Sequence, residues 1–473
     1  MGRERTSFGR LADAVPGPSG EAAAPGTSGQ LAAGEEPYPS AARSYYIIFV
    51  LAIVVMFTIL DRQVLALMIE PIKADFGISD TQAALLMGAA FSLTYAVAGL
   101  PIARIADVAN RRNIIALCLA SWSAATMAGG IAQNYAQLFA ARLGIGIGEA
   151  GYAPATWSLV TDSFPRERVA FATGTIAIGG HLGNGLALII GGSALALVAA
   201  FPPVPLPLIG ELRPWQWAFI IVGFPGLLWT LMVMTLREPK RRGVGAADRK
   251  SIPIATVARY LASDWRAYSA IIGGMAMKFL MSLGTSQWMP TLFRREFDWD
   301  LTRIGLIQGC VILAVGPIGL VLGGKLSERW NRMGMRDADL RIVFYTILIS
   351  LPVSIIFPLL PDPYVMLVLY GVVIFVSSLG IGPATAAFQL ITPNRMRAQV
   401  SALYMFCMNV IAFAMGPLII ALFTDYLFKD PQDLNYSLSL TAAALGPIAV
   451  LLVWQGMKPY ARSYERAARG FTD

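Results

Sequence analysis

The sequence predicts an all-α integral membrane protein in which twelve transmembrane helices form two six-helix bundles. Of its 473 residues, 56% are hydrophobic and only 14% are charged, and the mean hydropathy is +0.59. Twelve apolar runs, each near the roughly 20 residues that cross the hydrocarbon core of a bilayer, follow one another along the chain. A charged motif that ends the second run recurs at the end of the eighth. These observations exclude a soluble multidomain protein.

The predicted spans have approximate bounds. Several are longer than one straight crossing requires, so tilt or kinks at prolines such as Pro154 must absorb the excess. The spans cover residues 45–69, 82–103, 113–133, 136–163, 170–200, 215–236, 268–291, 304–324, 342–360, 364–391, 399–427 and 437–457.

The remaining segments predict the domain organisation. Residues 1–42 are rich in Gly, Ala, Pro and Ser and contain no apolar run, so we expect a disordered cytoplasmic tail. The first apolar run is not followed by a small-residue cleavage site, and we therefore expect no cleaved signal peptide. The expected order is the tail 1–42, the N-terminal bundle 43–236, a cytoplasmic linker 237–266, the C-terminal bundle 267–457 and a cytoplasmic tail 458–473.

The distribution of lysine and arginine predicts the orientation. Most of the 37 basic residues lie in the N-terminal tail, the even-numbered loops and the C-terminal tail. Because short cytoplasmic loops accumulate lysine and arginine, both termini are expected in the cytoplasm. This asymmetry, together with contact with anionic lipid headgroups, accounts for the net charge of +8. The charge therefore predicts membrane lipids as partners, and no nucleic acid.

A repeated motif divides the chain into two parallel halves. The second span ends in ARIADVANRR and the eighth in GKLSERWNR, so that Asp107 aligns with Glu328 and Arg111 with Arg332. FPRERVA after the fourth span is echoed by TPNRMRA after the tenth. Two parallel six-helix halves with such loops resemble the major facilitator superfamily, whose hallmark is Gly-x-x-x-Asp-Arg-x-Gly-Arg-Arg. The first copy departs from it at Ala103, Val108 and Asn110.

In the superfamily these loops clasp neighbouring helices in the outward-facing state. The resemblance thus implies a conformational latch, whereas the alternative is a charged cluster that is merely solvated at the membrane edge. The latch candidates are Asp107, Arg111, Arg112, Glu328, Arg329 and Arg332.

No cofactor or metal site is expected. GLVLGGKL, residues 319–326, has the Gly-x4-Gly-Lys spacing of a phosphate-binding loop, but Leu326 stands where Ser or Thr is needed and an apolar span precedes it. One histidine, His181, cannot build a multi-histidine metal site. The three cysteines all fall inside apolar spans, where they pack as small hydrophobic residues.

Four charged residues lie within the first and fourth spans. An ionisable side chain at bilayer depth costs roughly 3 kcal/mol, so it normally faces a cavity or a partner. Arg142 and Glu149 share one helix face about 10 Å apart, and Asp61 and Arg142 have similar expected depths, which predicts an Asp61–Arg142 ion pair. Arg62 points about 100° away from Asp61, so one of the two faces the fourth helix and the other the cavity. The alternative is that Asp61 and Arg62 only hold the bundle together.

These residues carry a more specific resemblance. LDRQ, ADVANRR, RLGIGIGEAGYAPA and TDSFPRERVAFATG are similar to the Spinster family of the major facilitator superfamily, closely in the N-terminal half and at superfamily level in the second half. Spinster proteins transport lysolipids and sphingolipids, including sphingosine-1-phosphate. The compact loops favour a bacterial inner-membrane relative, whose own cargo can differ. The resemblance assigns the family's embedded Asp-Arg pair and its helix-four Arg and Glu to Asp61, Arg62, Arg142 and Glu149.

Three further polar residues bear on the substrate. Lys278 lies near the middle of the seventh span, where it either holds an anionic headgroup or is neutral or snorkelled. His181 in the fifth span either titrates near neutral pH or packs as a hydrogen-bonding group. Tyr152 either lines an amphipathic cavity or packs in the core. With Arg62 and Arg142, these three residues form the predicted substrate site.

The sequence thus predicts a monomeric secondary transporter, and no enzyme, that moves a lysolipid- or sphingolipid-like anion by alternating access and couples it to protons. Glu149 is expected to bind the proton, while Asp61 releases or regains Arg142. The alternative within transport is a multidrug or metabolite proton antiporter. A membrane lipid-modifying enzyme or a sensor is the alternative from another class, although no nucleophile with a base is evident.

Overall fold

The computed structural model describes residues 38–106, 108–200, 205–206, 210–241, 253–393 and 396–468. The described residues from Pro39 onward belong to one compact unit. Most of the predicted tail 1–42 therefore lies outside the described residues, as do residues 242–252 of the predicted linker.

The N-terminal half is built from helices that follow the predicted spans. Its elements are α1 (Ala41–Phe76), α2 (Asp80–Ala84), the π-helical turn η1 (Leu85–Ala89), α3 (Ala90–Ala106), α4 (Arg111–Gly130), α5 (Tyr135–Glu149), α6 (Tyr152–Ser163), α7 (Arg166–Ala199) and α8 (Pro214–Met234). Between α7 and α8, β1 (Pro205–Leu206) pairs antiparallel with β2 (Gly210–Glu211).

The C-terminal half repeats this helical pattern. Its elements are α9 (Ile254–Ser263), α10 (Trp265–Phe297), α11 (Leu301–Arg332), α12 (Ala338–Ile356), η2 (Phe357–Leu359), α13 (Pro363–Leu379), α14 (Ile381–Ile391), α15 (Arg397–Cys407), the π-helical η3 (Met408–Ala414), α16 (Met415–Leu422), η4 (Phe423–Phe428), η5 (Pro431–Asp433) and α17 (Leu434–Ala468). The short helix α9 falls inside the predicted linker and packs on this half, where the Tyr260 hydroxyl donates to the Ile391 carbonyl at 2.8 Å.

The predicted fold class is confirmed. Among the described residues, 11 helical segments are long and apolar enough to cross a membrane, and each matches one predicted span. The remaining span, 136–163, is divided between α5 and α6. Pro154 has no N–H to donate to the Ala150 carbonyl, so the helix breaks there. Gly151 occupies the break, and a Cβ on it would clash with Ile102 and lie 3.0 Å from the Cys118 sulfur.

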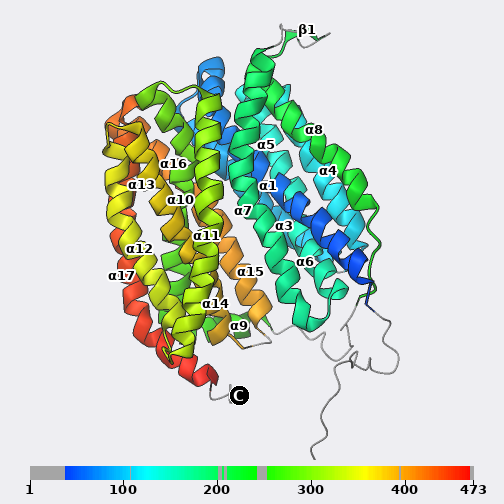
Figure 1. The fold of residues 1–473 in the computed structure, drawn as a ribbon, viewed down its shortest axis with the longest axis vertical. Helices are drawn as coiled ribbons and strands as arrows, with labels where there is room; N and C mark the ends of the chain where they lie inside the picture. Colours follow the sequence, from blue (N-terminus) through cyan, green and yellow to red (C-terminus); the bar gives the residue numbers. More distant parts are fainter. Residues whose placement is uncertain are drawn as a thin grey trace, which may run out of the picture. The chain divides into compact units, whose positions relative to one another are not determined.

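The two halves meet along closely packed helices. Figure 1 shows α7 and α11 side by side, and small residues permit this approach. A Cβ on Gly309 would lie 2.5 Å from the Gly185 carbonyl oxygen, and one on Gly185 would lie 2.6 Å from the Gly309 carbonyl oxygen. Close backbone approach through glycine is typical of helix pairs in membranes. The interface of the halves therefore depends on these glycines.

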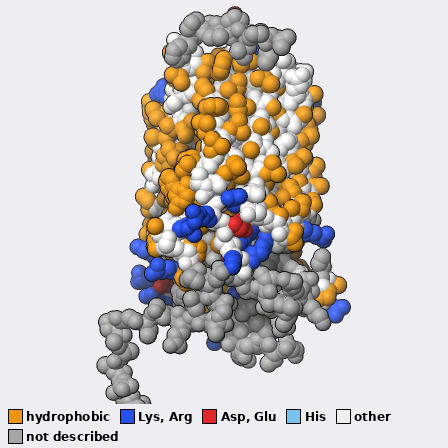
Figure 2. Space-filling view, turned by 90° about the vertical axis from the view of Figure 1, so that its right-hand side faces the viewer, with side chains coloured by type: hydrophobic (Ala, Val, Ile, Leu, Met, Phe, Trp, Pro, Cys, Tyr) orange, Lys and Arg blue, Asp and Glu red, His pale blue; other side chains and the backbone are white. Residues whose placement is uncertain are grey.

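The surface has the polarity that a bilayer requires. In Figure 2, hydrophobic side chains cover the middle of the visible face, while Lys and Arg side chains gather toward the lower end. This is the end at which α17 finishes (Figure 1). A hydrophobic belt with basic residues at one end is the pattern from which the membrane orientation was predicted.

Candidate functional site

A buried ion pair joins α1 to α5. Arg62 Nη2 donates to Glu149 Oε2 at 2.5 Å, and the Glu149 side chain is 0% exposed while that of Arg62 is 12% exposed. The Arg62 guanidinium also lies 4.1 Å from the ring centre of Phe91 and 5.0 Å from that of Phe413. Phe413 belongs to η3 in the other half, so Arg62 contacts both halves of the protein.

Arg142 lies beside this pair and is fully buried. Its Nε donates to the Leu86 carbonyl at 3.3 Å and its Nη1 to the Asp61 carbonyl at 3.4 Å, whereas Nη2 has no hydrogen-bond partner. Leu86 belongs to the π-helical turn η1, an irregularity that is frequent at functional sites. Arg142 therefore joins three helices through backbone oxygens.

The predicted Asp61–Arg142 ion pair is wrong. Among the described residues, no ion pair joins Arg142 to the Asp61 carboxylate: Arg142 reaches only the Asp61 backbone carbonyl, and Glu149 is paired with Arg62. The reason is helical geometry: Asp61 and Arg62 are neighbours about 100° apart on α1. Arg62 faces α5, and the Asp61 carboxylate lies beside Thr126 of α4. The four charges nevertheless form one buried cluster, since Asp61 interacts electrostatically with Glu149, Arg142 and Arg62.

Small residues allow α5 to bring Glu149 into the cluster. A Cβ on Gly146 would clash with Thr94 of α3, and one on Gly148 would lie 2.8 Å from Ser121 Oγ and 2.9 Å from the backbone nitrogen of Trp122 in α4. The glycine-rich run that surrounds Glu149 thus serves close helix packing. That packing excludes water from the carboxylate.

Lys278 of α10 occupies a second buried position, in the C-terminal half. Its Nζ donates to Thr346 Oγ1 at 3.0 Å and to the Ser377 carbonyl at 3.1 Å, and the residue is 5% exposed. Within the described part of the chain, no carboxylate lies within ion-pair distance of it. A Cβ on Gly380 would lie 2.6 Å from Nζ, so a larger residue there would require the lysine head group to shift.

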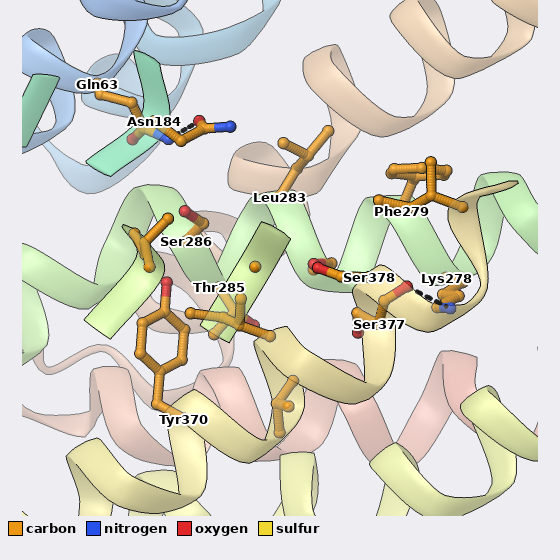
Figure 3. A pocket seen from close by; sticks show the side chains of 16 residues that line it. Gln63, Asn184, Lys278, Phe279, Leu283, Thr285, Ser286, Tyr370, Ser377 and Ser378 are labelled. Carbon is orange, nitrogen blue, oxygen red and sulfur yellow. Dashed lines mark hydrogen bonds between the residues drawn. The ribbon is translucent and has the colours of Figure 1, made fainter. Parts of the chain in front are cut away.

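Lys278 lines a cavity of about 170 Å³ between the halves. The N-terminal half contributes Gln63 and Asn184, and the C-terminal half contributes the rest of the lining (Figure 3). The polar lining of the C-terminal half consists of Lys278, Ser282, Thr285, Ser286, Tyr370, Ser377 and Ser378. The apolar lining includes Phe279, Leu283, Ile312, Val373, Ile374 and Ile381. The cavity is therefore amphipathic.

Tyr152, another predicted substrate residue, belongs with the charged cluster. Tyr152 packs edge-on against Trp122, with 5.7 Å between ring centres, and it interacts with Arg62 and Glu149 of the charged cluster. His181 belongs to α7, but its side chain is outside the described part of the structure. The predicted site is thus divided between the charged cluster and the cavity.

The latch candidates differ between the two halves. Arg111 is buried, pairs with Asp162, and donates from Nε to Glu238 at 2.7 Å. The Arg112 backbone donates to the same Glu238 at 3.1 Å. In the second copy, Glu328 pairs with Arg332 one helical turn away, both exposed, and Arg329 is also exposed. Asp107 lies outside the described residues.

A charged cluster that the sequence analysis missed joins the halves at the end opposite the α17 terminus. Arg295 of α10 donates to Glu70 at 2.8 Å and to Asp80 at 2.7 and 2.9 Å, and Lys73 also pairs with Asp80. Close by, the Thr81 hydroxyl and backbone N–H both donate to Asp425 at 2.6 Å. Asp80 and Arg295 are charged residues at helix ends beside apolar spans. This position is the sequence signal that could have identified them.

Helices that surround a buried charged cluster and an amphipathic cavity define a membrane transporter. The profile of the Major Facilitator Superfamily matches residues 51–417, and the chain belongs to that superfamily. Both the family and the fold are those of transporters, which excludes the lipid-modifying enzyme.

Individual relatives show which members the chain is similar to. It is 27% identical to an MFS-type efflux pump of Mycolicibacterium smegmatis over 438 residues, which cover 90% of this chain and 96% of the pump. It is 24% identical to the mouse sphingosine-1-phosphate transporter SPNS2 over 401 residues, 79% of this chain and 68% of that protein. The crystal structure of a bacterial homologue of the human lysosomal transporter Spinster, inward-facing and unoccupied, has the same fold, with a TM-score of 0.73 and 22% identity over 91% of this chain and 99% of that one. The predicted resemblance to the Spinster family is confirmed as a similarity.

Proposed function

We propose that this protein is a proton-coupled secondary transporter of an amphiphilic, lysolipid- or sphingolipid-like anion. The observation that carries the proposal is the position of Arg62, which pairs with the fully buried Glu149 in one half and stacks on Phe413 of the other. A proton on Glu149 removes the charge that holds Arg62. The contact of Arg62 with Phe413 then changes. Proton binding therefore changes the relative stability of the two conformations of the halves.

The two carboxylates of the cluster have separate parts in this mechanism. Glu149 takes the proton, because its partner Arg62 is free to turn toward the cavity once the charge is gone. Asp61 stays beside Arg142, whose contact with the Asp61 backbone carbonyl holds α1 in register with α5. Protonation therefore moves one arginine and leaves the other in place.

The anion is assigned to the amphipathic cavity. Lys278 is buried, and no carboxylate of the described residues pairs with it, so an anionic headgroup supplies the missing charge, and the apolar wall accepts a hydrocarbon segment. Arg62, Arg142 and Tyr152 stay as proposed contributors nearer the charged cluster, and His181 stays as a proposed contributor whose side chain is outside the described part of the structure. The similarity to a sphingosine-1-phosphate transporter supports this class of cargo.

A second candidate is a multidrug or metabolite proton antiporter. It is favoured by the efflux pump that matches 90% of the chain and by the hydroxyl-rich part of the cavity lining. Both candidates use the same charged cluster, and they differ only in the cargo.

The proposed setting is a monomer in a bacterial inner membrane with both termini in the cytoplasm. The basic side chains at the α17 end support this orientation (Figure 2). Under that orientation, the contacts of Arg295 and Thr81 close the outer end. Asp107 with the basic residues after it is the proposed latch of the opposite state, and Asp107→Asn is expected to favour the inward-facing state.

Uptake into proteoliposomes tests the proposal. Fluorescent lysophosphatidate is supplied with and without an imposed pH gradient, to the parent, to Glu149→Gln and to Glu296→Gln, whose glutamate is exposed. The parent and Glu296→Gln should respond to the gradient, whereas Glu149→Gln should not. An equal response of Glu149→Gln contradicts proton coupling through this residue. If neutral sugars compete for transport and lysophosphatidate does not bind, the substrate class is wrong.

A further inference from the structure

The part of the cavity lining that comes from the N-terminal half is a pair of amide side chains. Gln63 Nε2 donates to Asn184 Oδ1 at 2.9 Å. Gln63 is 6% exposed, and its Oε1 has no hydrogen-bond partner. Buried polar atoms are nearly always paired in folded proteins, so this acceptor needs a donor. Because Gln63 lines the cavity, that donor can come from a ligand.

Hydroxyl groups of the C-terminal half lie at the same end of the cavity. Figure 3 shows Tyr370 pointing toward Ser286, on the side where Gln63 and Asn184 lie. Lys278, hydrogen-bonded to Ser377, lies on the opposite side of the view. The cavity thus has a cation at one end and neutral hydrogen-bonding groups at the other.

The spacing of the two ends follows from α10. Lys278 and Ser286 are eight residues apart on this helix, which corresponds to roughly 12 Å along its axis. Leu283 lies between them in the sequence and lines the cavity with Phe279 and Ile374. A ligand that reaches both ends therefore crosses an apolar stretch.

We propose that the cargo is a two-headed amphiphile. It carries an anionic group for Lys278, a hydrocarbon segment, and at its other end a hydroxyl or amine that donates to Gln63 Oε1. This inference rests on the proposed function and specifies the class of cargo. Among amphiphilic anions, it predicts tighter binding of those that carry a second polar group than of lipids with a single polar head and a plain acyl tail.

The same contacts link cargo to the charged cluster. Lys278 belongs to the C-terminal half and Gln63 to the N-terminal half, so a bound two-headed molecule bridges them. Gln63 directly follows Arg62 on α1. A ligand that holds Gln63 therefore restrains the helix turn that also carries the Arg62–Glu149 pair.

Equilibrium binding to the protein in nanodiscs tests the inference. The probes are radiolabelled decanoate and omega-hydroxydecanoate, whose extended chain matches the cavity, and binding to empty nanodiscs is subtracted. The parent should bind the hydroxylated probe about fivefold more tightly, the effect of one hydrogen bond. Gln63→Met should abolish this preference and still bind decanoate, and Lys278→Gln should weaken both probes to a similar degree.

A matched control is available on α10. Gln287 is buried to the same degree and also has an unpartnered Oε1, but it does not line the cavity. Gln287→Met should keep the preference for the hydroxylated probe. Asn184→Ala, at a half-buried position, is the second variant in case Gln63→Met is not monodisperse by size-exclusion chromatography, and it should reduce the preference.

The outcomes separate the two proposals. If the parent binds both probes equally, or if the preference survives in folded Gln63→Met and Asn184→Ala, the amide subsite is wrong and the proposed transport of amphiphilic anions stands. If the parent binds neither probe, the amphiphilic anion itself is the wrong class of cargo, and both proposals fail.

Discussion

Arg62 of α1 and Phe413 of η3 are in contact across the interface of the two halves, with 5.0 Å between the guanidinium carbon and the ring centre. The same guanidinium is paired with Glu149. One side chain thus joins the proton-binding candidate to the opposite half. Contacts of this kind connect a local charge change to a movement of whole helices.

Loss of the Phe413 ring should weaken the contact between the halves. A cation over an aromatic ring contributes about 1 kcal/mol, so Phe413→Leu should shift the equilibrium between conformations by roughly fivefold. Double electron–electron resonance distances between spin labels on the two halves measure this shift. Phe279→Leu changes a cavity phenylalanine that no arginine of the described residues contacts, and it should leave the distances unchanged. Equal shifts in both variants would contradict the role of Phe413.

Arg142→Gln should impair transport and lower stability. The substitution leaves the Leu86 and Asp61 carbonyls with weaker donors and takes a positive charge from a cluster that holds two carboxylates. Removing one member of a buried charged group costs on the order of 3 kcal/mol. The thermal unfolding midpoint and lysophosphatidate uptake should both fall, whereas Arg104→Gln, at an exposed position, should alter neither.

Arg295→Gln should destabilise the conformation seen here. The variant removes the cation that joins Glu70 and Asp80 to the C-terminal half, and the Asp80 side chain is fully buried. We expect the closed end to open more often, with a shift on the order of 3 kcal/mol. Distances between labels at that end provide the measurement.

The adjacent residue is the control for Arg295. Arg294 is 45% exposed and pairs with Asp298 one turn away on the surface. Exposed pairs contribute less than about 1 kcal/mol, so Arg294→Gln should have little effect on the distances. A comparable opening in both variants would mean that general surface charge, and not the cluster, keeps this end closed.

Gly380→Ala should weaken anion binding without removing the lysine. The new Cβ would lie 2.6 Å from Lys278 Nζ and 2.8 Å from Thr346 Oγ1, so the ammonium must leave its position. Gly382→Ala is the control, because a Cβ there has no atom within 4 Å. Decanoate binding in nanodiscs should drop severalfold for Gly380→Ala and stay at the parent value for Gly382→Ala. Unchanged binding in both variants would contradict the assignment of Lys278 to the anion site.

Hydropathy and residue type were sufficient to predict the class of protein and the members of the charged cluster. Each charge at bilayer depth is costly, so Asp61, Arg62, Arg142 and Glu149 had to find one another or a cavity whatever the detailed packing. The repeat of the loop motif similarly indicated two parallel halves. These conclusions depend on the chain alone because the bilayer is a uniform solvent that penalises every exposed charge.

Packing decided which charges pair and what the cavity contains. Whether Glu149 meets Arg62, and whether Asp61 meets Arg142, depends on the rotation of α1 and the depth of α5, and both are set by glycine contacts such as Gly146 against Thr94. The Arg295–Asp80 cluster joins residues more than 200 positions apart, and the lining of one cavity by both Gln63 and Lys278 spans a similar separation in the sequence. Helical periodicity specifies the face of a side chain relative to its own helix, whereas these pairings depend on the relative position of two helices, which only their packed side chains determine.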